Sequence, residues 1–180
     1  MKNLLFIALT IFVTLALPAR GQDGWKDDKG HRATDTDYRK SVNGFGGWVL
    51  VTSDANWRAK WETPSSSVPN FTEAKTVAKG QQVYVLAFFS NPLLDNSGDA
   101  DVTCDLDITR PDGTSSLHQT DVSCFKGKIK ESANHLFLSA PVIGFTREAG
   151  DKVGKWVVRI VLKDNVRGTV VPLSTSFVLK

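Results

Sequence analysis

The feature that most constrains the fold is a strict alternation of apolar and polar side chains. It is clearest over residues 101–109 (DVTCDLDIT), where every second residue is apolar and the others are aspartate or threonine. Successive side chains of a β-strand point to opposite faces of the sheet, so this pattern predicts a strand with one buried and one solvated face. Residues 156–163 and 171–179 show the same period of two.

Turn-forming sequences separate these segments. Arg110-Pro111-Asp112-Gly113 and residues 164–168 (DNVRG) are strong turn signals. Residues 83–89 (VYVLAFF) are apolar on both faces, which is typical of a central strand or of one covered by another segment. About seven strands with almost no helix predict an all-β chain that forms a single antiparallel β-sandwich.

The last predicted hairpin contains Gly150-Asp151, Gly154-Lys155-Trp156, Asp164, Gly168 and Phe177. In these residues, and more weakly over 107–113 (DITRPDG), the chain resembles the immunoglobulin-like domains of exported bacterial proteins. The resemblance implies an immunoglobulin-like β-sandwich, which we assign to residues 47–180. Such domains adhere, bridge or present loops, so the resemblance implies no particular activity.

The N-terminal segment predicts export. Residues 4–17 (LLFIALTIFVTLAL) form an apolar run interrupted only by two threonines. The run suits a signal peptide and is shorter than the roughly 20 residues of a membrane-spanning helix. Pro18 ends it, and Ala19 and Gly21 supply the small residues of a cleavage site. We therefore expect a signal peptide over 1–21, with an uncleaved anchor helix or a buried core helix as the alternatives. The product should be secreted or periplasmic, without membrane insertion after cleavage.

A charged segment follows the predicted signal peptide. Ten of the eighteen residues over 23–40 are charged, and such a composition buries too little apolar surface to offset chain entropy. Residues 43–47 (NGFGG) add three glycines. We therefore expect residues 22–46 to form a flexible segment that leads into the sandwich.

The charge balance argues against nucleic acid as a partner. The formal net charge is +3, and Lys2 and Arg20 contribute two of these charges from the predicted signal peptide, which leaves +1. A nucleic-acid-binding domain needs lysines and arginines clustered on one face, and here the charges are scattered.

The chain has two cysteines, Cys104 and Cys124. An even number in an exported protein predicts a disulfide, with two buried free thiols as the alternative. The two cysteines flank the turn at Pro111-Asp112-Gly113. The bond would therefore join neighbouring strands, or a strand to the segment after its partner, and would stabilise the fold by roughly 3 kcal/mol on the chain-entropy model.

Two tryptophans are the first candidate for a binding surface. Ser53-Asp54 is a helix-capping sequence, and a short helix over 55–62 would place Trp57 and Trp61 on one side at a spacing of four. Exposed, they would stack on a sugar ring or on a partner's side chain. Packed on the sandwich, they would complete its core, and this is the interpretation we favour.

A polar loop is the second candidate. Residues 95–101 (DNSGDAD) place the oxygens of Asp95, Asn96, Asp99 and Asp101 together with a glycine. Such a loop suits Ca²⁺, but it lacks the spacing and the final glutamate of an EF-hand, and a solvated turn explains it equally well. Asn70 begins a glycosylation sequon, Asn-Phe-Thr, which matters only in a eukaryotic source.

Signals for catalysis and for cofactors are weak. The chain has three histidines and lacks Gly-x-Ser-x-Gly, and its one methionine is Met1, so a His/Met copper site is not expected. We predict no enzyme activity, no cofactor and no metal centre. A hydrolase would require two of His118, His135 and the aspartate face at 101, 105 and 107 to converge.

These observations predict an exported, non-catalytic binding or assembly module of the cell envelope. Its expected partner is a protein in the envelope or the extracellular space. The first alternative is a module that binds carbohydrate or a calcium-dependent ligand. The second alternative is a hydrolase with an unrecognised site.

Overall fold

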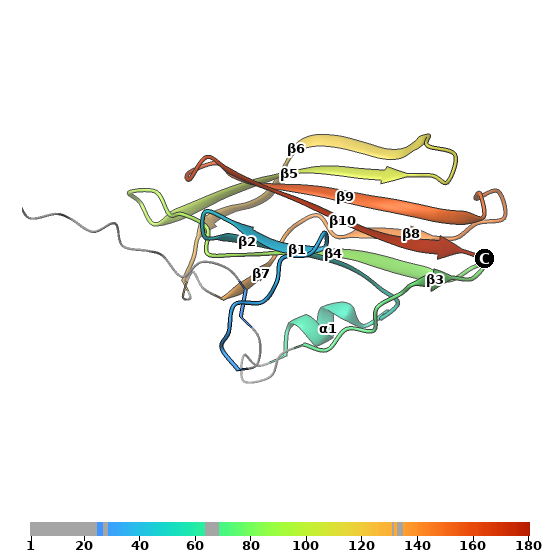
Figure 1. Ribbon diagram of the computed structural model, residues 1–180, viewed down its shortest axis with the longest axis horizontal. Helices are drawn as coiled ribbons and strands as arrows, with labels where there is room; N and C mark the ends of the chain where they lie inside the picture. The colour runs from blue at the N-terminus through green and yellow to red at the C-terminus, as the bar shows by residue number, and fades with distance from the viewer. Residues whose placement is uncertain (1–24, 27–28, 64–68, 131, 133–134) are drawn as a thin grey trace, which may run out of the picture.

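The chain folds into a sandwich of two β-sheets (Figure 1). The computed structural model describes residues 25–26, 29–63, 69–130, 132 and 135–180. The predicted signal peptide, residues 1–21, lies outside this part of the chain. Within it, no helix is long and apolar enough to cross a membrane.

The first sheet, here the β4 sheet, contains β1 (Arg39–Val42), β2 (Phe45–Thr52), β4 (Gln82–Ser90), β7 (Leu136–Leu138) and β8 (Ile143–Thr146). The second, the β9 sheet, has the order β3 (Thr76–Val77), β10 (Thr169–Leu179), β9 (Gly154–Asp164), β5 (Asp99–Thr109) and β6 (Ser115–Lys128). All strand pairs are antiparallel except β3 with β10. The predicted antiparallel β-sandwich is thus confirmed.

The core lies between the sheets and contains the alternating apolar residues expected from the sequence. Trp156, Val158, Ile160 and Leu162 of β9 are buried, and the apolar residues of β5 and β10 pack with them in one cluster. The structure contains more strands than the roughly seven expected. Four of them, β1, β3, β7 and β8, have only two to four residues each. Strands this short show no clear sequence period, so the alternation of side chains does not reveal them.

The sandwich begins before the expected boundary at residue 47. β1 pairs with β2 in a hairpin whose turn residues, Asn43 and Gly44, have φ angles of 49° and 83°. A tight two-residue hairpin requires such positive φ values, and Asn-Gly is its preferred sequence. Upstream, the indole nitrogen of Trp25 donates a hydrogen bond to the carbonyl of Lys40 at 3.1 Å. Residues 39–46, expected to be flexible, therefore form ordered sheet.

Gly47 sets a close approach between the two sheets. A Cβ atom at this position would lie 2.9 Å from Leu162 Cδ1, 3.0 Å from Val171 Cγ1 and 3.1 Å from Leu173 Cδ1. A larger side chain would require the side chains of Leu162, Val171 and Leu173 to shift. The glycine therefore lies at a close contact between the sheets and does not provide the flexible joint suggested by the sequence.

The predicted disulfide is present. Cys104 of β5 and Cys124 of β6 are bonded, with their Cα atoms 5.8 Å apart. β5 and β6 are neighbouring strands joined by the predicted turn at 110–113. The bond ties edge strand β6 to the sandwich, as expected from the position of the cysteines around that turn.

A buried ion pair joins three chain reversals at one end of the sandwich. The Asp164 carboxylate is fully buried, pairs with Nε of Arg167 at 3.2 Å and accepts a hydrogen bond from the Leu93 amide at 2.8 Å. The other guanidinium nitrogens of Arg167 donate to the carbonyls of Asn43 and Asn91, at 3.0 and 2.9 Å. One arginine thereby links the β9–β10 turn, the β1–β2 turn and the β4–β5 loop.

Candidate functional site

The outer face of the β4 sheet is apolar and carries a cover. β4 directs Val83, Val85 and Phe89 into the sandwich, while Leu86 and Phe88 on its opposite face are also fully buried. Figure 1 shows α1 (Trp57–Trp61) on the side of this sheet that faces away from β5 and β6. The cover explains why β4 is apolar on both faces. The sequence predicted this as one of two possibilities, a strand covered by another segment.

The cover is held in place by Asp54. Its carboxylate pairs with the Lys60 ammonium at 2.8 Å and accepts a hydrogen bond from the Thr72 amide at 2.8 Å. Lys60 also donates to the carbonyl of Asn70, an exposed residue, at 3.1 Å. Burial disfavours the charged form of Asp54, but the bonds from Lys60 and Thr72 outweigh it and lower its pKa to about 2. The charged carboxylate therefore joins Lys60 of α1 to the segment around Thr72.

The two tryptophans of α1 have different environments. Trp57 is 8% exposed and packs in a cluster with Leu50, Leu86 and Phe88. Trp61 is only half-buried, and its ring lies 5.2 Å from that of Phe88 between centroids. The interpretation of packing is confirmed for Trp57, while Trp61 keeps part of its surface accessible.

A hollow of about 580 Å³ opens between α1 and the segment that joins β7 to β8. Its apolar lining includes Trp57, Trp61, Tyr84 and Pro141. Two charged residues, Arg58 of α1 and Glu62 directly after the helix, also line it. The guanidinium of Arg58 lies over the Trp57 ring, 4.7 Å from its centroid, which holds a cation at the rim of an aromatic surface.

A second hollow of about 360 Å³ adjoins the first, because Trp61 and Leu138 line both. Phe137 and the two lysines Lys128 and Lys130 complete its lining with Phe125, Ile129 and Leu136. We call the two hollows together the Trp61 trough. Sequence reasoning found Trp61 but missed its partners, which are Tyr84 of β4 and residues between 125 and 144, far from Trp61 in the chain.

The wall of the trough opposite α1 includes residues 139–141, whose backbone amides are already bonded or absent. The Ser139 amide and hydroxyl both donate to the carbonyl of Ala87, each at 2.9 Å. The Ala140 amide donates to the carbonyl of Cys124 at 2.9 Å, and Pro141 has no amide hydrogen. Over residues 139–141 the wall therefore offers a ligand side chains and carbonyl groups, but no unused amide N–H.

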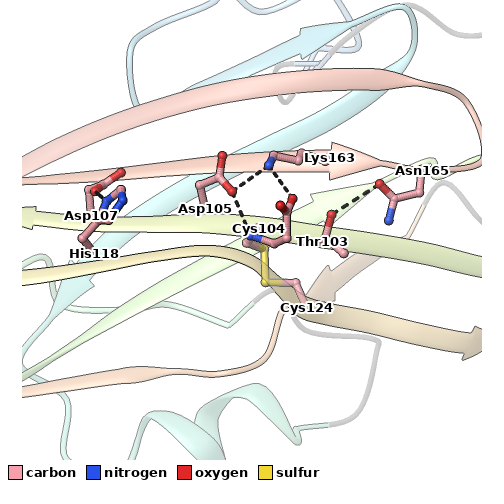
Figure 2. A network of polar contacts seen from close by, with 9 residues as sticks. Thr103, Cys104, Asp105, Asp107, His118, Cys124, Lys163 and Asn165 are labelled. Carbon is pink, nitrogen blue, oxygen red and sulfur yellow. Dashed lines mark hydrogen bonds and ion pairs between the residues drawn. A yellow bond between two sulfur atoms is a disulfide. The ribbon is translucent and has the colours of Figure 1, made fainter.

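The outer face of the β9 sheet carries a polar network instead (Figure 2). The Lys163 ammonium contacts carboxylate oxygens of Asp105 and Asp121 at 2.6 and 2.7 Å, and these bonds raise its pKa. Beside it, Nδ1 of His118 lies 2.5 Å from a carboxylate oxygen of Asp107. This hydrogen bond raises the pKa of His118.

Two of the groups proposed for a hydrolase thus meet, since His118 contacts Asp107. The His118 side chain is 65% exposed on the strand surface and belongs to neither hollow of the trough. Asp105 is paired with Lys163, and Asp101 is paired with Lys126 at 3.0 Å. The remaining candidate, His135, precedes β7 in the other sheet.

The candidate calcium loop is organised as a turn. One carboxylate oxygen of Asp95 accepts hydrogen bonds from the amides of Ser97 and Asp99, at 2.8 and 2.9 Å, and these bonds lower its pKa. Asp101 accepts a bond from Asn165 at 2.9 Å, while Asn96 is exposed.

The loop borders a hollow of about 280 Å³ that Asp95, Asp99 and Asp101 line together with Lys126. In the described part of the chain, no three histidine, cysteine, aspartate or glutamate side chains are grouped so that they could hold a metal ion. These contacts agree with the alternative interpretation of the loop as a solvated turn.

Comparisons with known proteins identify no family for the chain. No protein-family model matches the chain, and no curated protein matches it. A family 123 glycoside hydrolase from Clostridium perfringens is similar in structure, with a TM-score of 0.43 and 9% identity over 76% of this chain and 27% of the hydrolase. A Niemann-Pick type C2 protein from the Japanese carpenter ant has a TM-score of 0.38 and 10% identity over 73% of this chain and 89% of that protein.

The chain therefore spans about a quarter of the length of the hydrolase. Both similar structures are β-rich. Identities and TM-scores this low carry no conclusion about activity or ligand.

Proposed function

We propose that the chain is an exported, non-catalytic binding module and that the Trp61 trough is its ligand surface. The observation that carries the proposal is the incomplete cover of the β4 sheet. α1 buries Trp57 but leaves Trp61 half-buried between two adjoining hollows. Ligand sites are typically concave and largely apolar, with a few polar groups that fix orientation, and the trough has this composition.

The disulfide supports the exported part of the proposal. Disulfides persist in oxidising compartments such as the periplasm and the extracellular space, and Cys104 is bonded to Cys124. The predicted signal peptide also indicates export to the periplasm or the extracellular space.

The composition of the trough supports a role in binding rather than catalysis. Of the described residues that line it, Glu62 is the only acid, and none is histidine or cysteine. General acid–base catalysis requires a positioned proton donor or acceptor, and hydrolysis of glycosides normally uses two carboxyl groups. The His118–Asp107 pair lies on the outer face of the opposite sheet, away from this aromatic surface.

Ligand mapping by NMR tests the proposal. Amide spectra of the mature protein would be recorded with a panel of neutral oligosaccharides, acidic oligosaccharides and acidic peptides. We expect at least one class to shift amides of α1 and of residues 136–142. Trp61→Ala should weaken that binding by about tenfold or more, as expected for an aromatic anchor.

The matched control is Tyr38→Ala, which removes an aromatic side chain that is 47% exposed and does not line the trough. It should leave binding unchanged. Thermal unfolding of both variants checks that they remain folded. Binding that survives Trp61→Ala, or a panel that shifts no amide of the trough, would contradict the proposal.

A further inference from the structure

We infer that the ligand of the Trp61 trough is an acidic polysaccharide, a chain of sugars that carry carboxylate or sulfate groups. This inference rests on the proposed function, because it names the ligand class of the same surface. It follows from the charges of the trough, its aromatic lining, its backbone and its length.

The charged groups of the trough are mostly positive. Arg58, Lys128 and Lys130 line it, against the single acid Glu62. Among the described residues, neither Arg58 nor Lys130 has a carboxylate within ion-pair distance. Lys128 is partly balanced, since its charge helps to lower the pKa of Asp95. Unpaired cations beside an apolar surface favour a ligand with negative charges at its edge.

The aromatic lining suits a sugar ring. One face of a pyranose is formed by C–H groups, which carry a small positive charge and pack on the negative face of an aromatic ring. Trp61 and Tyr84 line the trough as side chains of this kind. Arg58 and Glu62, at the same hollow, would donate to and accept from the hydroxyl groups around the ring.

The backbone at residues 139–141 of the wall offers no amide to an extended peptide. A peptide that binds beside a sheet gains most of its affinity from hydrogen bonds to free main-chain groups. Here the amides of Ser139 and Ala140 are already bonded within the protein, and Pro141 has none. Over residues 139–141 a ligand is therefore recognised through side chains and carbonyl groups, which fits a sugar chain with charged substituents.

The two hollows together favour a chain over a single sugar. Each hollow alone, at about 580 and 360 Å³, lies within the range of pockets that hold a small molecule. They meet at Trp61 and Leu138. A ligand that uses both the Arg58 side and the Lys130 side must therefore extend past Trp61.

Calorimetry with matched probes tests the inference. Short oligogalacturonate and sulfated oligosaccharides would be compared with neutral cello-oligosaccharides of equal length and with an oligoglutamate peptide. We expect heat only with one or both acidic sugars, and affinity that falls as salt is raised, because exposed charges are screened. Arg58→Gln and Lys130→Gln should each weaken binding by about threefold to fivefold, the effect of one exposed charge pair.

The control is Lys79→Gln, which removes the charge of an exposed lysine that does not line the trough. It should leave affinity unchanged. If neutral sugars or the peptide bind the trough as tightly as acidic sugars, the inference fails and the proposed function stands. If no probe binds and no trough amide shifts, both fail.

Discussion

The two outer faces of the sandwich differ in chemistry and in what lies on them. The outer face of the β4 sheet is aromatic and is covered by α1 and by the segment around Phe71. The outer face of the β9 sheet carries charges that pair with one another, as Lys163 does with Asp105 and Asp121. An apolar face needs a cover that removes its side chains from contact with water, whereas a charged face does not.

This difference explains where a ligand surface can arise. On the β9 sheet several positive and negative groups pair with one another, as Lys163 does with Asp105 and Asp121 and Lys126 does with Asp101. On the β4 sheet the cover is five residues of helix with flanking segments, and it leaves Trp61 and the cations around it partly open. The trough is therefore a consequence of covering a large aromatic face with a small element.

The largest effect is expected from Trp57→Ala. The substitution removes a nearly buried indole from the cluster around Leu86 and Phe88 and should lower the free energy of unfolding by about 3–5 kcal/mol. Urea unfolding followed by circular dichroism measures it. Trp61→Ala is the matched comparison and should cost less than half as much, since Trp61 is only half-buried. Equal losses would show that the two tryptophans do not differ as described.

A smaller effect is expected from acid acting on the cover. The folded pKa of Asp54 is about 2 against an ordinary value of 3.8. Its carboxylate therefore stabilises the fold above about pH 4, and this contribution is lost as the pH falls towards 2. The side chain is 12% exposed, and the shift corresponds to about 2 kcal/mol.

The measurement is the difference in unfolding free energy between the wild type and Asp54→Asn across this pH range. The difference should be present at neutral pH and vanish near pH 2. A difference that stays constant with pH would mean that the charge of Asp54 does not hold the cover.

The smallest effect on stability is expected on the charged face. Asp107→Asn removes the hydrogen-bond partner that raises the pKa of His118, so that pKa should fall towards its ordinary value. Because a raised histidine pKa stabilises the fold at low pH, any loss of stability should appear in acid and disappear as the pH rises. NMR titration of the His118 ring measures the pKa. Asp105→Asn should shift it less, because Asp105 acts only through a weaker charge interaction.

Local patterns made much of the sandwich predictable. The alternation in β5, β9 and β10 and the turn at 110–113 depend on neighbouring residues alone, and they also placed the disulfide. β1 was missed because the charge-rich composition of residues 23–40 suggested disorder, although Asn43-Gly44 is a hairpin signal. The tryptophan spacing indicated the short helix but not which ring would remain accessible.

The trough could not be read from the sequence. Its walls come from α1, from Tyr84 of β4 and from residues between 125 and 144, which only tertiary structure brings together. The calcium loop shows the opposite difficulty. Its oxygens are adjacent in sequence, yet Asp95 uses one of them to bind the amides of its own turn, and composition alone does not show this.

The arginine that joins three chain reversals also restricts how this end of the molecule can vary. Arg167 binds carbonyl groups of Asn43 and Asn91, so its contacts depend on the backbone path of both loops and not on their side chains. A change of length in either loop removes a partner from the same cation. The effect of a length change in one of these loops therefore depends on the other two. A graft of foreign loops at this end would have to replace all three together.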